Sequence, residues 1–177
     1  FLHEWKDRLQ KFGLELHPDK THLIEFGRFA IANRERREAG KPETFNFLGF
    51  THICGKTRKN GRFTVTRRTI RKRLTAKLRE LKEELRRRWH EPTDEVGKWL
   101  RSVVQGYFNY HAVPGNTDSL NSFRTQVLWH WHRALQRRSQ KGRMTWERFV
   151  SSSARWIPNP QILHPYPDLR FDATHPR

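Results

Sequence analysis

The sequence predicts an α+β fold in which a small antiparallel sheet is followed by a mainly α-helical region. Two observations support this fold class. First, residues 45–66 hold two segments of β-favouring residues on either side of Asn60-Gly61, a strong signal for a two-residue hairpin turn. Second, from Arg67 onward the apolar residues recur at every third or fourth position, which is the spacing of the buried face of a helix.

The first 26 residues predict a helix, a short strand, a turn and a second strand. Apolar residues on one face of the predicted helix are Leu2, Trp5, Leu9 and Phe12. Gly13 is placed to end the helix, and an apolar run at 14–16, a turn at 17–20 and a β-favouring segment at 21–26 follow. This pattern predicts the edge of an α/β or α+β unit rather than a complete one. Because the sequence opens at Phe1 inside a helical pattern, we expect the natural polypeptide to extend further towards its N-terminus.

The predicted sheet follows a charged segment. Residues 28–42 have the composition of a loop with some helical character. Phe45, Phe47 and Gly49 alternate with Asn46, Leu48 and Phe50, which predicts one strand over 45–53. The turn at Asn60-Gly61 should join that strand to a second strand over 62–66.

A long basic helix is predicted over residues 67–90, with a length of about 36 Å and an end before Pro92. Its apolar stripe consists of Ile70, Leu74, Leu78, Leu81, Leu85 and Trp89. The segment carries eleven Lys and Arg and three Glu, so eleven minus three leaves a charge of +8. We expect this excess to contact phosphates, since pairing within the helix cannot neutralise it. The alternative is a solvated helix face.

Three more helices are predicted after this one. Thr93-Asp94-Glu95 should cap the second helix, whose apolar face comprises Val96, Trp99, Leu100, Val103, Val104, Tyr107 and Phe108. The third helix starts at Thr117 or Asp118 and ends near 138. Thr145 should cap a short fourth helix that Pro158 stops, and the last twenty residues, with five prolines, are expected to be an extended tail.

The charge balance indicates a polyanionic partner. Thirty-six Lys and Arg against 18 Asp and Glu give a net charge of +18 and a pI near 11.1. Nucleic acid relieves such self-repulsion most directly. A membrane is disfavoured, because no apolar stretch is long enough to span a bilayer and no lipidation signal is present. The remaining alternative is a basic protein without a polyanionic ligand.

Cysteine, histidine and aspartate patterns give no metal site. Cys54 is the single cysteine, which excludes an internal disulfide and a Cys-rich zinc site and fits a reducing cytoplasm. His130 and His132 are two positions apart on a predicted helix, so their side chains point about 200° apart and cannot share one ion. No acidic cluster is present, and Asp19, Asp94, Asp118, Asp168 and Asp172 are scattered along the chain and suit caps and turns. We therefore predict no metal ligands in this chain.

Two short motifs have a chemical interpretation and an ordinary one. In LELHPDKT (14–21), Lys20 lies on a turn between predicted strands, where it could meet a phosphate or donate a proton, or be a solvated turn lysine. In FNFLGFTH (45–52), Gly49 lies among aromatic residues. Glycine at that position permits close approach of a nucleic-acid backbone or of a neighbouring strand, and it is also typical of a bulge in an ordinary strand.

In this order the two motifs resemble the last conserved blocks of the palm in group II intron reverse transcriptases, including the Phe-Leu-Gly-Phe primer grip. TRRTIRKRL (66–74) and the helix that follows resemble the thumb. WLRSVVQGYFNYHAVPGN (99–116) and WHRALQRRSQKGRMTWERF (131–149) resemble the maturase-specific domain, called domain X. ILHPYPDLRF (162–171) resembles the tail of bacterial members. These collinear segments carry the resemblance over essentially the whole chain.

The resemblance implies four regions in chain order. These are the C-terminal part of a polymerase palm at 1–66, a thumb-like basic helix at 67–92, the helices of domain X at 93–157 and an extended tail at 158–177. The implied function is to bind intron RNA and an RNA–DNA template-primer, and so to assist RNA splicing and reverse transcription. Expected partners are these nucleic acids and the N-terminal fingers and palm of the same protein, in a bacterial cytoplasm, with no membrane.

The chain departs from the family pattern at the catalytic centre. The Tyr-Ala-Asp-Asp hairpin is absent, and two-metal polymerisation requires such carboxylates to hold Mg²⁺. Mg²⁺ is therefore expected in the intact RNA-directed DNA polymerase, and no cofactor is expected in this segment, which should be inactive alone. We expect the resemblance to be to members of the family without a DNA-cleaving domain, since the sequence contains no His-Asn-His or Cys-paired endonuclease motif. By resemblance, Lys20 is the candidate catalytic residue, as a proton donor to pyrophosphate.

The expected contacts with RNA or template-primer fall into three groups. The primer-grip group is Phe47, Leu48 and Gly49. The basic-helix group is Arg67, Arg68, Arg71, Lys72, Arg73 and Lys77. The group in the region that resembles domain X is Arg101, Arg133, Arg137, Arg138, Lys141 and Arg143, with Tyr107, Tyr110 and His111 as candidates for stacking on unpaired bases. Core packing is the alternative for Tyr107, and it is the preferred role for Phe108.

Two other functions fit parts of the pattern. One is a stand-alone RNA-binding splicing factor that has lost the polymerase active site, which a start codon directly before Phe1 would favour and an in-frame Tyr-Ala-Asp-Asp block would exclude. The other is a general binder of double-stranded DNA. That function predicts no preference for structured intron RNA in competition binding.

Overall fold

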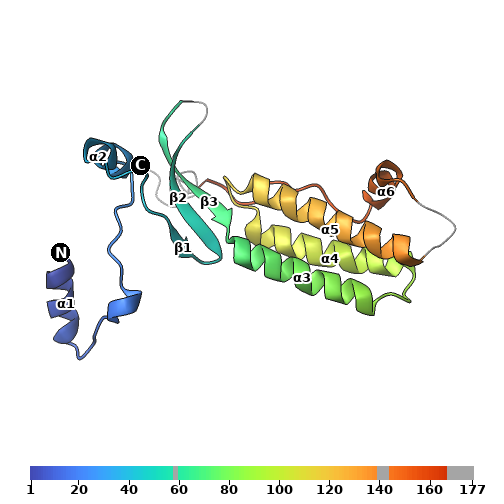
Figure 1. The fold of residues 1–177 in the computed structure, drawn as a ribbon, viewed down its shortest axis with the longest axis horizontal. Helices are drawn as coiled ribbons and strands as arrows, with labels where there is room; N and C mark the ends of the chain where they lie inside the picture. The colour runs from blue at the N-terminus through green and yellow to red at the C-terminus, as the bar shows by residue number, and fades with distance from the viewer. Residues whose placement is uncertain (58–59, 139–143, 167–177) are drawn as a thin grey trace. The chain divides into compact units, whose positions relative to one another are not determined.

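The structure is a computed structural model that describes residues 1–57, 60–138 and 144–166 (Figure 1). The described residues form an α+β fold with a three-stranded antiparallel sheet and six α-helices, as the sequence predicted at this level. The chain divides into two compact units. We call residues 1–45 with 53–65 the N-terminal unit, and residues 46–52 with 66–177 the helical unit.

The N-terminal unit contains two short helices. Helix α1 (Leu2–Gln10) forms where the sequence predicted it, and none of its residues is buried. Helix α2 (Ala30–Arg36) accounts for the helical character of the predicted loop. Contacts within the unit include an ion pair between Arg37 and Glu25 and an edge-to-face ring contact between Phe26 and Phe45 with centroids 4.8 Å apart.

The prediction of two strands within residues 14–26 is wrong. The segments 14–16 and 21–26 have no regular structure, and a 3₁₀ turn (Pro18–Lys20) lies between them. A strand needs a neighbour to satisfy its backbone hydrogen bonds, and an isolated pair of strands is marginal in water. Local preference for β structure is therefore not sufficient here, and the side chains of Leu14 and Leu23 are 57% and 66% exposed.

The sheet has the order β1 (Phe45–Phe47), β2 (Phe50–Lys56) and β3 (Phe63–Thr69). The single strand predicted over 45–53 is wrong, because the chain reverses at Leu48-Gly49. These two residues have φ of +46° and +86°, the two positive values that a two-residue type I′ hairpin requires. The Phe-Leu-Gly-Phe motif thus places its central dipeptide in a tight turn.

The predicted hairpin around Asn60-Gly61 is present, with a longer loop than expected. The last pair before the loop is Thr57 with Arg62, where the Thr57 amide donates to the Arg62 carbonyl at 2.8 Å. Four residues, 58–61, separate that pair, and 58 and 59 lie outside the described residues. Gly61 has φ of +65°, and the amide of Arg62 donates to the side-chain oxygen of Asn60 at 3.3 Å.

The predicted helix 67–90 is wrong at both ends. Strand β3 continues to Thr69, and helix α3 covers Arg71–Arg87, which shortens it to about 26 Å. The strand is prolonged because the buried amide of Thr69 donates to the side chain of Asn116, 47 positions away in sequence, at 2.9 Å. Arg67 and Arg68 therefore lie on a strand.

The helical unit is built on α3, α4 (Thr93–His111) and α5 (Thr117–Arg138), which lie side by side, and α6 (Trp146–Ser153) packs on α5 (Figure 1). The predicted apolar faces form its core, whose fully buried members include Leu100, Val104, Leu120, Phe123, Val127, Trp131 and Phe149. The predicted cap of α6 is confirmed, since Thr145 accepts from the Arg148 amide at 3.4 Å. The predicted cap of α4 is wrong, because Thr93 is already helical and Pro92 precedes it.

A buried asparagine joins two elements at one end of this bundle. Asn116 lies in the short segment that connects α4 to α5, and its side chain is fully buried. Its oxygen accepts from the Thr69 amide at 2.9 Å, and its nitrogen donates to the Thr69 hydroxyl at 2.9 Å and to the His111 carbonyl at 2.8 Å. Buried polar groups are costly unless they are paired. Here the pairing holds the end of β3 against the end of α4.

The segment after α6 returns to the end of α4. The amides of Leu163 and His164 both donate to the carbonyl of Ala112, at 3.0 and 3.2 Å, and the His164 ring bonds the Asn109 carbonyl at 2.8 Å. The predicted tail 158–177 is described as far as Tyr166, without helix or strand, and 167–177 lie outside the described residues. Within the described parts of the chain, no helix is long and apolar enough to cross a bilayer.

Candidate nucleic-acid interface

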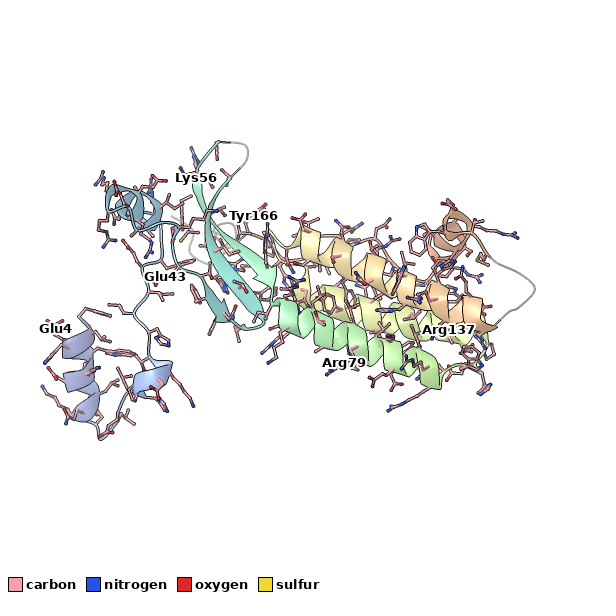
Figure 2. All side chains as sticks on the ribbon, in the orientation of Figure 1. Glu4, Glu43, Lys56, Arg79, Arg137 and Tyr166 are labelled. Carbon is pink, nitrogen blue, oxygen red and sulfur yellow. The ribbon has the colours of Figure 1, made fainter. Side chains whose placement is uncertain are left out.

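Cationic side chains extend from the exposed surfaces of α3 and α5, Arg79 and Arg137 among them (Figure 2). Two pockets of the helical unit open beside these helices, and both combine cations with aromatic rings. We call them the α3–α4 pocket and the α3–α5 pocket after the helices that line them. Their positions on α3 differ by about 180° around its axis, because Arg73 and Lys82 are nine residues apart at about 100° per residue.

The α3–α4 pocket has a volume of about 400 Å³. Its lining comes from two helices and consists of Arg73, Lys77, Ser102, Val103, Gly106, Tyr107, Tyr110 and His111. Five of these residues were predicted from the sequence as RNA contacts. The structure therefore brings together two members of the basic-helix group, Arg73 and Lys77, and the aromatic group of the prediction.

The hairpin turn between β1 and β2 lies against this pocket. The hydroxyl of Tyr110 donates to the Leu48 carbonyl at 2.7 Å, and the amide of Ile70 donates to the Gly49 carbonyl at 3.1 Å. A side-chain carbon added to Gly49 would lie 3.2 Å from a guanidinium nitrogen of Arg73, so glycine allows this approach. Phe47 and Leu48 remain 58% and 65% exposed, and they present an apolar tip beside the cations.

The three predicted stacking residues differ in accessibility. Tyr107 belongs to the core, with its ring between His111 at 4.0 Å and Phe123 at 3.7 Å, so core packing describes it and neither face is open to a base. Tyr110 is half exposed and stacks on Phe50. Base stacking by Tyr110 and His111 stays a prediction.

Burial sets the ionisation of this pocket. Desolvation lowers the pKa of His111 below its ordinary value, the hydrogen bond to the Tyr107 carbonyl opposes that shift, and the charge of Arg73 adds to it. Desolvation also raises the pKa of Tyr107. Both side chains are therefore held neutral near pH 7, and the positive charge comes from Arg73 and from Lys77, which pairs with Glu80 at 2.8 Å.

The α3–α5 pocket was not predicted as a unit. Its lining consists of Lys82, Leu85, Arg86, Trp89, Trp129, His130, Arg133, Ala134 and Arg137. Arg133 and Arg137 were predicted as RNA contacts, and the other two cations and the three rings were not. The available signals were the four-residue spacing of Lys82 and Arg86 and that of Trp129 and Arg133, which places each pair on one helix face.

The remaining predicted residues are dispersed. Arg67 is half-buried on β3, Arg68 lies 4.0 Å from Asp118, and Arg71, Lys72 and Arg101 are exposed and line neither pocket. Arg138 donates to the Glu91 carbonyl at 2.5 Å and so joins α5 to the loop before α4. Lys20 is exposed in the N-terminal unit. Lys141 and Arg143 lie outside the described residues.

Comparison with known proteins adds no family assignment. No family model, curated protein or solved structure matches this chain. The described residues include no group of three or more His, Cys, Asp or Glu placed to hold a metal ion. The resemblance to intron-encoded reverse transcriptases is thus a prediction from the motifs alone.

Proposed function

We propose that this chain binds structured RNA through its helical unit, as the C-terminal segment of a group II intron reverse transcriptase and maturase. In that role it holds intron RNA and template-primer, and it assists splicing and reverse transcription in a bacterial cytoplasm. Polymerisation itself, with Mg²⁺, belongs to the intact protein. The exposed apolar side chains of the N-terminal unit, such as Phe12 and Leu23, support the proposed contact with the fingers and palm of the same protein.

One observation carries the proposal. The α3–α4 pocket gathers cations from α3, a half-exposed tyrosine from α4 and an exposed apolar turn into one site. Cations meet phosphates, while aromatic and apolar groups meet unpaired bases. The three chain segments lie far apart in sequence, so their convergence does not follow from the charge excess alone.

A competition experiment tests the proposal. Filter binding with a labelled group II intron RNA fragment should show an affinity that falls by roughly 10³–10⁵ between 50 and 200 mM salt, if about 6–10 phosphates are contacted. Double-stranded DNA of equal length should compete poorly. Equal competition by that DNA would support a general DNA binder, and tight binding without salt dependence would refute phosphate contact altogether.

Two variants locate the contact. Arg73→Gln should weaken binding to all RNA sequences and reduce the salt slope by about one unit. Arg148→Gln on α6 is the matched control, since it removes the same charge from an exposed position that lines neither pocket. An equal change of slope in both variants would show diffuse attraction rather than a site.

The proposed catalytic contribution of Lys20 has its own test in the intact polymerase. Lys20→Ala should slow single-turnover nucleotide incorporation, because a positioned proton donor to pyrophosphate is lost. Since Lys20 is exposed, the substitution should leave folding unchanged. An unchanged incorporation rate would end the assignment.

A further inference from the structure

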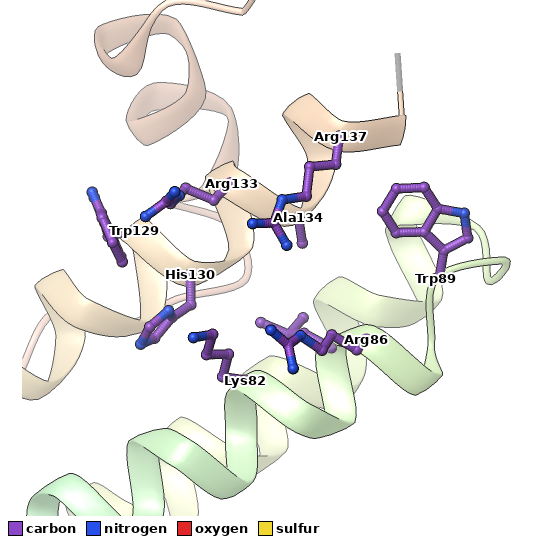
Figure 3. Close-up of a pocket in the computed structure, with 9 residues that line it drawn as sticks. Lys82, Arg86, Trp89, Trp129, His130, Arg133, Ala134 and Arg137 are labelled. Carbon is purple, nitrogen blue, oxygen red and sulfur yellow. The ribbon is translucent and has the colours of Figure 1, made fainter. Parts of the chain in front are cut away.

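The α3–α5 pocket is a small cavity of about 150 Å³ (Figure 3). Its lining has three kinds of group. Leu85 and Ala134 are apolar, Trp89, Trp129 and His130 are aromatic, and Lys82, Arg86, Arg133 and Arg137 are cationic. In the view of Figure 3, Trp129 and Trp89 lie at opposite ends, with cationic side chains between them.

In the described part of the chain, the cations of this pocket have no acidic partner. Over residues 1–57, 60–138 and 144–166, no carboxylate lies within 4.0 Å of the cationic groups of Lys82, Arg86, Arg133 or Arg137. Elsewhere on and just after α3, Lys77, Arg87 and Arg88 each pair with a glutamate. Four like charges around one cavity repel each other, and an anion relieves that repulsion.

A stacking surface is already assembled at one end. The guanidinium carbon of Arg133 lies 4.5 Å from the centre of the Trp129 ring, a cation–π contact. Trp129 is 43% exposed. Both indole rings and guanidinium planes stack on unpaired bases of RNA. The two groups are already in contact without a ligand, so less reorganisation is needed when a base joins them.

The size of the cavity limits what can enter. A cavity of about 150 Å³ is enough to hold one six-membered ring, as benzene occupies engineered cavities of that size. Two fused rings need more space. A base inside a duplex also keeps both faces covered by its neighbours, so the entering base must be unstacked. Cavity size and stacking therefore favour a single unpaired pyrimidine.

We propose that the α3–α5 pocket holds one unpaired pyrimidine of an RNA strand, stacked on Trp129 and Arg133, with the adjoining phosphates contacted by Lys82, Arg86 and Arg137. The inference rests on the proposed RNA-binding function and names a nucleotide for a site outside the α3–α4 pocket. With this pocket, the chain would recognise an unpaired nucleotide in a bulge or loop in addition to binding phosphates. The affinity for RNA should therefore depend separately on the base in the pocket and on the number of phosphates contacted.

The test uses the full chain and three hairpin RNAs that differ at one bulged position. The bulge is a uridine, an adenosine or an abasic nucleotide, so the phosphate number is constant. Base stacking contributes about 1–3 kcal/mol, so the uridine bulge should bind roughly 5–150-fold more tightly than the abasic one. The adenosine bulge should bind less tightly than the uridine bulge.

Two variants remove the base preference by different routes. Trp129→Ala deletes the stacking surface, and Ala134→Met fills the cavity while it keeps all four cations. Both should bind uridine and abasic hairpins equally, with the salt slope unchanged. Trp5→Ala is the matched control, because Trp5 is also 43% exposed and belongs to the N-terminal unit. Circular dichroism confirms that each variant keeps its helices.

The outcomes separate this inference from the proposed function. Equal affinity of the wild-type chain for uridine and abasic hairpins, or a preference that survives in both pocket variants, overturns the pocket assignment while RNA binding stands. Absence of salt-dependent binding to any hairpin overturns the proposed function itself. Strong competition by free uridine monophosphate, in molar excess, overturns the assignment to an RNA strand in favour of a free nucleotide.

Discussion

The two units of the chain bury very different amounts of apolar surface. In the helical unit, fifteen buried side chains form one continuous core. In the described part of the N-terminal unit, Ala30 is the one buried hydrophobic residue, while Phe1, Phe12 and Leu23 are between 66% and 84% exposed. Since burial contributes about 25 cal/mol per Å² of apolar surface, most of the stabilisation by burial lies in the helical unit.

The two units therefore differ in how firmly their structure is held and not in whether they carry positive charge. Both units carry many cations, but only the helical unit holds them on helices fixed by a core. A cation on a fixed helix presents its charge at a defined position, which site-specific binding requires. For this reason we place the proposed RNA contacts in the helical unit.

Paired tryptophan substitutions should show the largest contrast. Trp131→Ala removes a core side chain that is 2% exposed and should cost about 3–5 kcal/mol of unfolding free energy. Trp5→Ala removes a side chain that is 43% exposed and should change that free energy by less than about 0.5 kcal/mol. Urea unfolding followed by far-UV circular dichroism measures both. Similar losses would show that the N-terminal unit has a core of its own.

Asn116→Ala should have the next largest effect. The substitution leaves the Thr69 amide and the His111 carbonyl without their partner, so we expect a loss of about 2–4 kcal/mol. Asn121→Ala, at an exposed position on α5, is the matched control and should be nearly neutral. A mild effect at Asn116 would mean that β3 and α4 are held together by other contacts.

Gly97→Ala and Gly106→Ala on α4 should act in opposite directions. A side-chain carbon at Gly97 would lie 2.8 Å from the ring of Trp156, and overpacking should outweigh the gain in helix propensity for a net loss of about 1–2 kcal/mol. A carbon at Gly106 meets nothing within 4 Å, so that variant should gain up to about 1 kcal/mol. Thermal unfolding of the two variants gives the comparison. Stabilisation by both would remove the packing role of Trp156.

Leu48→Gly should stabilise the hairpin turn and weaken RNA binding. A leucine at φ +46° is strained, and glycine should recover about 0.5–1 kcal/mol. The same change deletes an exposed apolar side chain beside the α3–α4 pocket. Urea unfolding of this variant should show the gain in stability, and filter binding of the same variant should show the loss of RNA affinity. Leu48→Asn, which tolerates positive φ but is polar, separates strain from contact, and unchanged RNA affinity in both would exclude a contact by Leu48.

Acidification from pH 7 to pH 5 should lower stability by a smaller amount. Burial lowers the pKa of His111 and of His130 below the ordinary 6.5, and Lys82 and Arg133 lower the pKa of His130 further. The unfolded chain therefore binds more protons below about pH 6.5, and stability falls with pH there. Urea midpoints across this range should decline, and His130→Gln should flatten the decline. A flat profile in the wild-type chain would contradict these shifts.

Much of the helical unit could be predicted because its signals are local. The spacing of Leu100, Val104 and Phe108 defines a buried face without any knowledge of neighbours. The boundary between β3 and α3 could not be predicted in that way. It depends on Asn116, which lies 47 positions beyond Thr69. The turn at Leu48 escaped prediction because leucine at positive φ has no sequence signal.

The sequence indicated which residues supply the positive charge of the candidate site. It did not indicate how the helices arrange those residues into pockets. Arg73 was expected to face phosphate because the helix is basic, and it does line a pocket. Arg138 carried the same expectation and is used in a contact with the Glu91 carbonyl. The α3–α5 pocket needed knowledge of which helices pair. Neither composition nor periodicity contains that information, so Trp129 and His130 were missed.

The Tyr110 hydroxyl couples the conformation of the hairpin turn to ligand binding in the α3–α4 pocket. That hydroxyl donates to the Leu48 carbonyl, and it can donate to one acceptor at a time. In the proposed complex, a phosphate oxygen that accepts the hydrogen bond of Tyr110 competes with the Leu48 carbonyl for that donor. Binding linkage then requires that a partner which holds the turn in its bent form lowers the affinity of the pocket for phosphate by the same factor.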